Sequence, residues 1–285
     1  MASNPPAKCC TIGVKHEGTP SGKSVKVGQH EAYLATPPEG KAHKDTAILY
    51  LPDVLGIWQN AQLIADQFAA NGYLTLVPDL FNGDPIPVNG LGGMDIMTWL
   101  KEGSDGKHPH TKEVVDPIVV EAIKVLKEEY GVKKIGAVGY CFGGKVLFPL
   151  PSPSPSSPAP LNPVPPSNLP YTNLPPPQQY VVRHYKDGIQ VGFVAHPSFV
   201  EEDELAAITG PLSIAAAETD QIFPAEKRHK SEVILKDTKL PYQINLYSGV
   251  SHGFAVRCDL SDKVQKWAKE QAFNQAVAWF DQHLV

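Results

Sequence analysis

One cysteine lies between glycines in the stretch GYCFG (139–143), directly after the apolar run KIGAVGY. A nucleophile on a sharp turn between a strand and a helix needs small neighbours, because the turn is strained and the helix packs closely on the strand. The amino end of such a helix also stabilises a thiolate. The pattern favours Cys141 as a nucleophile, and the alternative is a structural cysteine buried in a glycine-rich turn.

Two further polar residues follow Cys141 at the ends of apolar runs. Asp220 comes after AAAET, and His252 comes after LYSGVS. If these runs are parallel strands, both residues lie at the carboxyl edge of a sheet, where catalytic groups collect. Taken singly, Asp220 could be a turn or capping residue and His252 a surface turn residue. The order nucleophile, acid, histidine along the chain nevertheless indicates a catalytic triad.

Strand-like and helix-like segments alternate along the chain, and the expected strands are almost continuously apolar. Such strands are typical of a parallel sheet covered by helices on both faces. The strands are expected at 46–53, 73–81, 133–140, 189–197, 211–220 and 242–249, and the helices at 60–72, 111–131 and 262–284. Residues 82–111 are expected to form a long loop that selects the substrate. We predict one α/β domain over residues 1–285.

The proline-rich segment 146–179 interrupts this pattern, with 13 of the chain's 28 prolines and neither charge nor glycine. Proline excludes a helix here, so a disordered, polyproline-like insertion is expected. Without the segment, GYCFGGK would continue into YVVRHYKDG as the helix after the nucleophile, ending at Gly188. The segment begins with Val and ends with Gln, whose codons can hold the GT and AG of intron boundaries. We hypothesise a retained intron, and the alternative is a genuine disordered insertion.

The 285-residue chain has a net charge of -5 and a pI near 6.1. This balance offers no basic surface for nucleic acid, and no apolar run reaches the roughly 18 residues of a membrane span. Because the N-terminus lacks an apolar signal-peptide core, a cytoplasmic location is expected. The cysteines at positions 9, 10, 141 and 258 show neither a disulfide framework nor a zinc-binding spacing. No metal or organic cofactor is predicted, and the sequence does not indicate an oligomeric state.

The chain resembles the dienelactone hydrolases of the α/β-hydrolase superfamily, especially their fungal members. The resemblance covers nearly the whole chain outside the proline-rich segment and rests on LPDVLG, NGYLTLVPDLF, GYCFGGK, AAETDQIFP and SHGFAVR. It implies the α/β-hydrolase fold and a triad of Cys141 as nucleophile, His252 as base and Asp220 as the residue that orients the base. It also implies an oxyanion hole formed by the backbone N–H groups of Val54 and Phe142.

Three more residues are candidate substrate contacts. Asp53 stands where some members of the family carry a glutamate linked to ionisation of the thiol, and it is one methylene shorter. The resemblance links Arg257 to the carboxylate of a substrate. His196 in VAHPSFV is predicted to line the pocket, and a structural histidine before proline is the alternative. His108 and His110 are spaced like metal ligands, but no third ligand is nearby in the sequence, so a solvated loop is favoured.

We therefore predict a cysteine-dependent hydrolase of a small carboxylic ester or lactone, acting through an acyl-thioester intermediate without a cofactor. Two alternatives stay open. One is a protein of this fold that binds a small molecule or another protein without efficient hydrolysis. The other is an isomerase or lyase in which the same thiol and base transfer a proton.

Overall fold

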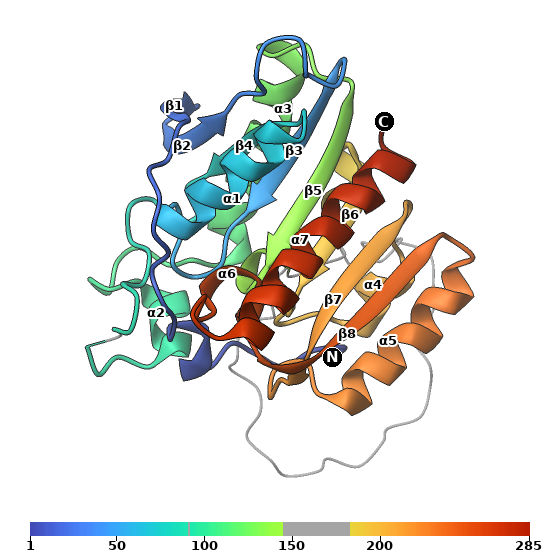
Figure 1. Ribbon diagram of the computed structural model, residues 1–285. Coiled ribbons are helices and arrows are strands. Elements are labelled where there is room, and N and C mark those ends of the chain that lie inside the picture. The colour runs from blue at the N-terminus through green and yellow to red at the C-terminus, as the bar shows by residue number, and fades with distance from the viewer. Residues whose placement is uncertain (91, 145–182) are drawn as a thin grey trace, which may run out of the picture.

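The computed structural model describes residues 1–90, 92–144 and 183–285. Within these residues one eight-stranded sheet forms the centre of the molecule, and helices cover both of its faces (Figure 1). The spatial order of the strands is β1-β2-β4-β3-β5-β6-β7-β8. The strands are β1 Lys23–Val27, β2 His30–Ala35, β3 Thr46–Leu51, β4 Leu74–Pro78, β5 Lys134–Tyr140, β6 Ile189–Ala195, β7 Leu212–Thr219 and β8 Tyr242–Ser251.

Strands β3 to β8 are parallel to one another, as predicted from their apolar sequences. β1 and β2 are antiparallel and form one edge of the sheet. Neither strand was predicted from the sequence, and β1, KSVKV, is mostly exposed and lacks the apolar run of the central strands. The carboxyl ends of the six parallel strands lie at one edge of the sheet, which is where ligands and catalytic groups collect in such folds.

The helices fall into two groups according to the face of the sheet with which they bury apolar residues. α1, α6 and α7 share one apolar cluster, and α2 to α5 contribute to the cluster on the opposite face. The helices are α1 Gln59–Ala70, α2 Ile96–Glu102, α3 Lys112–Glu128, α4 Glu202–Ala206, α5 Ala225–Thr238, α6 Phe254–Arg257 and α7 Lys263–His283, with 3-10 helices η1 Lys8–Cys10, η2 Cys141–Gly144 and η3 Arg183–Asp187. The mixed α/β architecture predicted from the sequence is confirmed.

Two helices differ from the sequence expectations. The long loop 82–111 contains α2, whose amino end is capped by the Asp95 carboxylate accepting from the N–H groups of Met97 and Thr98. Trp99 of this helix is buried in the core, whereas Met97 is exposed. α5 was missed because its sequence AEKRHKSEVILKDT is mostly polar and buries only Ser231 and Leu235.

The proline-rich segment 146–179 lies outside the described residues, and so do residues 145 and 180–182 of the helix expected after Cys141. On the two sides of this gap the chain forms η2 and η3, which are 3-10 helices rather than α-helix. η3 is followed by Gly188, as predicted, and the φ of this glycine is 126°. The positive φ explains why a glycine ends the helical segment there.

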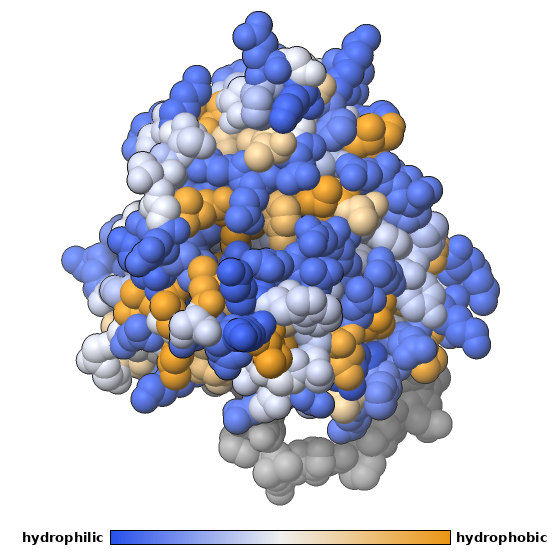
Figure 2. All heavy atoms as spheres, viewed as in Figure 1, coloured by the Kyte–Doolittle hydropathy of each residue, from blue (hydrophilic) through white to orange (hydrophobic). Residues whose placement is uncertain are grey.

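The surface mixes hydrophilic and hydrophobic residues on the face drawn in Figure 2. Among the described residues, no helix combines the length and apolarity that a membrane span requires.

Candidate active site

The turn after β5 holds Cys141 in a strained backbone conformation. The φ of Cys141 is 51°, in the left-handed region that residues with a side chain rarely adopt. Two residues later, a Cβ atom on Gly143 would lie 2.0 Å from the carbonyl oxygen of Leu51. Glycine is therefore required because η2 packs directly on the end of β3. This is the physical basis of the small neighbours in GYCFG.

His252 and Asp220 form a buried pair at the ends of β8 and β7. His252 Nδ1 donates to the Asp220 carboxylate, with distances of 3.1 Å to Oδ1 and 2.9 Å to Oδ2. The same carboxylate accepts from the backbone N–H groups of Ile222 and Phe223. Burial opposes ionisation of Asp220, but the hydrogen bonds from His252 and the two amides lower its pKa. The pair fixes the imidazole so that Nε2 points away from the carboxylate.

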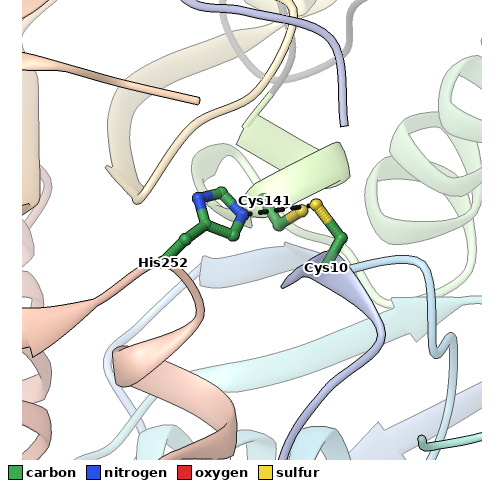
Figure 3. A group of neighbouring side chains, drawn as sticks. All are labelled: Cys10, Cys141 and His252. Carbon is green, nitrogen blue, oxygen red and sulfur yellow. Dashed lines mark hydrogen bonds between the residues drawn. The ribbon is translucent and has the colours of Figure 1, made fainter. Parts of the chain in front are cut away.

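Two thiols face His252 Nε2 (Figure 3). The sulfur of Cys10 lies 3.5 Å from Nε2, and the sulfurs of Cys10 and Cys141 and Nε2 all lie within 4.8 Å of one another. Cys10 belongs to η1 of the N-terminal segment, more than a hundred residues from either partner in sequence. On the other side, Cys141 Sγ is 3.9 Å from Ser198 Oγ. The turn, the histidine and the N-terminal segment thus build one buried cluster.

Cys10 and Ser198 are the members of the site that sequence reasoning missed. Ser198 follows the end of β6, so the rule that drew attention to Asp220 and His252 could have found it. Cys10 gave no comparable signal, because it lies in a segment without strand or helix periodicity.

The charges in the cluster favour a thiolate at Cys141 and an imidazolium at His252. Burial opposes ionisation of Cys141, but the hydrogen bond from Cys10 and the charges of His252 and Arg257 hold the pKa of the Cys141 thiol well below its usual value. Burial likewise opposes protonation of His252, while the Cys141 thiolate and the Asp220 carboxylate raise its pKa to about 10. A thiolate paired with an imidazolium is the reactive form of a nucleophilic cysteine.

A second buried ion pair joins Asp53, after β3, to Arg257, in α6. Arg257 Nη1 donates to Asp53 Oδ2 at 2.7 Å and to the carbonyl oxygen of Cys10 at 2.5 Å. Its Nε and Nη2 are buried without a hydrogen-bond partner in the described residues. Burial raises the pKa of Asp53 to about 6, against the lowering effect of Arg257. The guanidinium therefore binds Asp53 through Nη1, and its Nε and Nη2 are available to donate to another group.

His196 packs behind the base. Its ring lies edge-on to His252 with centroids 4.9 Å apart and is also close to Phe254. Both ring nitrogens are buried without a hydrogen-bond partner in the described residues, and burial together with the charge of His252 lowers the pKa of His196 well below its usual value. His196 is thus a neutral neighbour of the base, and its contact with substrate stays a prediction.

The two residues predicted to supply oxyanion donors lie on neighbouring turns. β3 and β5 are paired in parallel with Leu51 opposite Gly139, so the turns that carry Val54 and Phe142 are adjacent. Both residues are fully buried. The geometry brings a thiol, a base, an orienting acid and these two turns to one edge of the sheet.

His108 and His110 contact different carboxylates. His108 is exposed and lies 2.8 Å from Asp105, whereas His110 is buried and lies 2.9 Å from Asp84. The expectation of a solvated loop is therefore wrong for His110, which packs against the rings of Phe81 and Trp99. The loop folds back on the core because α2 brings Trp99 inward.

Comparison with known proteins agrees with this architecture. The family model described as Dienelactone hydrolase family matches residues 30–158 and 179–284. The chain is 44% identical to the hydrolase pyvD of Aspergillus violaceofuscus over 286 residues, which cover 100% of this chain and 99% of that protein. It is 29% identical to dienlactone hydrolase 1 of Gibberella moniliformis over 289 residues, which cover 99% and 95% of the two chains.

Solved structures share the fold at low sequence identity. A putative dienelactone hydrolase from Klebsiella pneumoniae superimposes with a TM-score of 0.65 at 14% identity, covering 92% of this chain and 99% of the other. The α/β-hydrolase fold predicted from the sequence is thereby confirmed. The protein is a carboxylic ester hydrolase by class, and the chain belongs to the dienelactone hydrolase family.

Proposed function

We propose that this protein hydrolyses a small carboxylic ester or lactone with Cys141 as nucleophile, His252 as general base and acid, and Asp220 as the residue that orients His252. The observation that carries the proposal is the buried chain of contacts from Asp220 through His252 to the thiol cluster around Cys141. Its position at the carboxyl edge of the parallel strands, beside a strained turn, supports the same assignment.

Acylation begins with the thiolate of Cys141 attacking the carbonyl carbon of the substrate. The N–H groups of Val54 and Phe142 stabilise the negative charge that develops on the carbonyl oxygen, and loss of one such donor typically costs about 3 kcal/mol. The C–O bond to the alcohol then breaks, and the His252 imidazolium gives its proton to the departing oxygen. In a lactone, that alcohol remains attached to the acyl group, so ring opening leaves one thioester.

Deacylation uses the same base in the opposite direction. Neutral His252 takes a proton from water, and the resulting hydroxide attacks the thioester carbonyl. The thiolate leaves as the carboxylic acid forms, and the thiolate–imidazolium pair is restored. Asp220 holds the imidazole in one orientation and stabilises its positive charge in both half-reactions.

The residues around the thiol support an anionic substrate. Arg257 has two buried donors without a partner in the described residues, so it can hold a carboxylate while Nη1 stays on Asp53. The names of the relatives that are dienlactone hydrolases favour a lactone over an open ester. His196 contributes to the pocket wall in this proposal, and the cytoplasmic location remains a prediction of the sequence.

The test is turnover of p-nitrophenyl acetate by the full chain, followed as release of nitrophenolate. We expect Cys141→Ala to lower kcat/KM by at least about 10⁴-fold, because the nucleophile acts together with the base as a unit. Cys258→Ala, which removes another buried thiol, should retain the rate. Mass spectrometry of the quenched reaction should find the acetyl group on the peptide that contains Cys141.

Two outcomes would contradict the proposal. If the wild-type chain folds but does not release nitrophenolate, the protein is a binding member of its family rather than a hydrolase of simple esters. If Cys141→Ala and wild type react equally, the nucleophile lies elsewhere.

A further inference from the structure

Cys10, Cys141 and His252 bring three metal-ligand atoms together, although they come from three distant parts of the chain (Figure 3). Their two sulfurs and Nε2 lie within 4.8 Å of one another. The Cys10 and Cys141 side chains are fully buried, and that of His252 is nearly so. Hydrolysis as proposed above uses Cys141 and His252 but assigns no role to Cys10. The second thiol is the feature that requires an explanation.

The spacing fits a tetrahedral ion. With Zn–S bonds of about 2.3 Å and Zn–N bonds of about 2.0 Å, neighbouring ligand atoms lie about 3.5 to 3.8 Å apart. The Cys10 to His252 distance of 3.5 Å already meets this requirement. The remaining separations, each within 4.8 Å, need a contraction of at most about 1.3 Å, which side-chain torsions can supply. Two sulfurs and one imidazole are also the donors that thiophilic cations prefer to oxygen ligands.

The surroundings of the cluster complete a metal site. Asp220 accepts from His252 Nδ1, which leaves Nε2 as the coordinating atom and orients its lone pair, as carboxylates bonded to ligating histidines do in zinc sites. Two thiolates balance the charge of a divalent cation, so the neighbouring Asp53–Arg257 pair can stay as it is. A cavity of about 290 Å³, lined by Ile12, Gly13, Val14 and His252 among others, reaches the cluster on the His252 side, and neither sulfur lines it.

We propose that Cys10, Cys141 and His252 form a tridentate site for a thiophilic divalent cation of the zinc class. Binding deprotonates both thiols, releases to solvent any proton they still carry, and leaves a fourth position for water. The ion takes the thiolate of Cys141 and Nε2 of His252 at once, so it blocks both the nucleophile and the base. This inhibitory consequence rests on the proposed function, whereas the binding itself does not.

The binding test uses the full chain, prepared without metal and under reducing conditions, with zinc in equilibrium dialysis and with cobalt(II) as a spectroscopic probe. We expect one zinc per chain and a cobalt–thiolate charge-transfer band with the intensity of two thiolates. Cys10→Ser should weaken zinc binding by at least about 100-fold and halve the cobalt band, because a direct ligand contributes at least as much as an outer-shell one. Magnesium, which prefers oxygen ligands, should not compete.

Cys9→Ser is the matched control, because Cys9 is not one of the three clustered ligand residues and the serine hydroxyl can keep the hydrogen bond that the half-buried Cys9 thiol makes with Cys10. Zinc affinity should be unchanged in this variant. Loss of binding in Cys9→Ser would instead indicate a site on the N-terminal cysteine pair and would overturn the proposal. Zinc binding by Cys10→Ser at wild-type strength would overturn it too. If Cys10→Ser does not fold, Cys141→Ser carries the same test, with a halved band expected and an unchanged band refuting the site.

Inhibition separates this inference from the proposed function. Zinc should inhibit nitrophenyl acetate hydrolysis by wild type and Cys9→Ser, and a chelator should restore it, whereas Cys10→Ser should require at least about 100-fold more zinc relative to its own zinc-free rate. Hydrolysis by a chain that neither binds zinc nor is inhibited by it would refute the metal site alone. Stoichiometric zinc binding by a chain that hydrolyses no ester would refute the proposed function alone.

Discussion

Two buried polar side chains, one at the carboxyl edge of the sheet and one in its body, differ in their hydrogen bonds. At the edge, His196 buries two ring nitrogens without a hydrogen-bond partner in the described residues. In the body, Gln275 of α7 donates to Ser213 Oγ and to the carbonyl oxygen of Ile214, and it accepts from the Tyr247 hydroxyl. The backbone differs as well, since Cys141, His196 and Phe199 near the edge all have positive φ.

We infer from this difference that the carboxyl edge holds the site, whereas the body of the sheet supplies stability. A buried polar group without a partner costs about 1 to 3 kcal/mol, and a residue in a sparsely populated backbone region costs a similar amount. The body of the sheet supplies the stability that tolerates this cost at the edge. Substitutions at the edge should therefore change activity more than stability, and substitutions in the body should do the reverse.

The largest effect is expected at the edge from Asp220→Asn. This change keeps the shape of the side chain but removes the charge that orients and stabilises protonated His252, so kcat should fall by about 10³-fold or more. The measurement is the steady-state hydrolysis of nitrophenyl acetate. Asp281→Asn, which alters a carboxylate bound to the Tyr73 hydroxyl in the body, is the control and should keep its kcat. An equal loss of kcat in both variants would contradict the expectation that activity depends more on the carboxyl edge than on the body of the sheet.

In the body, Phe280→Ala should lower the free energy of unfolding by about 3 to 5 kcal/mol, because it leaves a cavity under α7. The Phe280 ring is fully buried against Phe68 and Tyr73. Urea denaturation followed by circular dichroism measures the change. Trp267→Ala on the same helix, where the ring is 58% exposed, should change stability far less. If folded Phe280→Ala loses as much kcat as Asp220→Asn, the expectation that substitutions in the body change stability more than activity is wrong.

A smaller effect of opposite sign is expected from His196→Phe. Replacing an unpartnered buried imidazole by an apolar ring of similar size should raise the free energy of unfolding by about 1 kcal/mol. Because this ring supports His252, kcat/KM should fall at the same time. A variant that loses both stability and activity would show that His196 is a satisfied structural residue.

The smallest expected effect is the pH dependence of stability contributed by His16 and His110. Burial lowers the pKa of both residues in the folded protein. The unfolded chain therefore binds more protons than the folded one below pH 6.5, so stability falls as the pH drops from 6.5 toward the lowered values. Urea midpoints at neutral and mildly acidic pH should show this loss. His110→Gln should reduce it, and the exposed His229→Gln should not.

Much of the site could be predicted from the sequence because its signals are local. The stretch GYCFG predicts a turn whose glycines are needed for close packing. Asp220 and His252 follow apolar strands in the order expected of a triad. The ion pair between Asp53 and Arg257 could not be predicted in the same way, because its partners are separated by about 200 residues and meet only through the fold.

The fold was predicted at the wholly buried central strands and missed at two elements that are mostly exposed. Thr46–Leu51 is wholly buried, and its apolar sequence identifies it directly. Lys23–Val27 and Ala225–Thr238 are largely exposed, so tertiary contacts rather than an apolar pattern define them. In the described residues, the helix expected after Cys141 is replaced by the 3-10 helices Cys141–Gly144 and Arg183–Asp187.

The parallel core, the turn that carries Cys141 and the order of the catalytic candidates could all be predicted from the sequence alone. These features depend on hydrophobic burial and backbone conformation, which act over a few neighbouring residues. Only the tertiary structure decided that Cys10 joins Cys141 at His252 and that Arg257 is held by Asp53. Such contacts require segments far apart in the chain to be brought together, and no local pattern encodes which segments will meet.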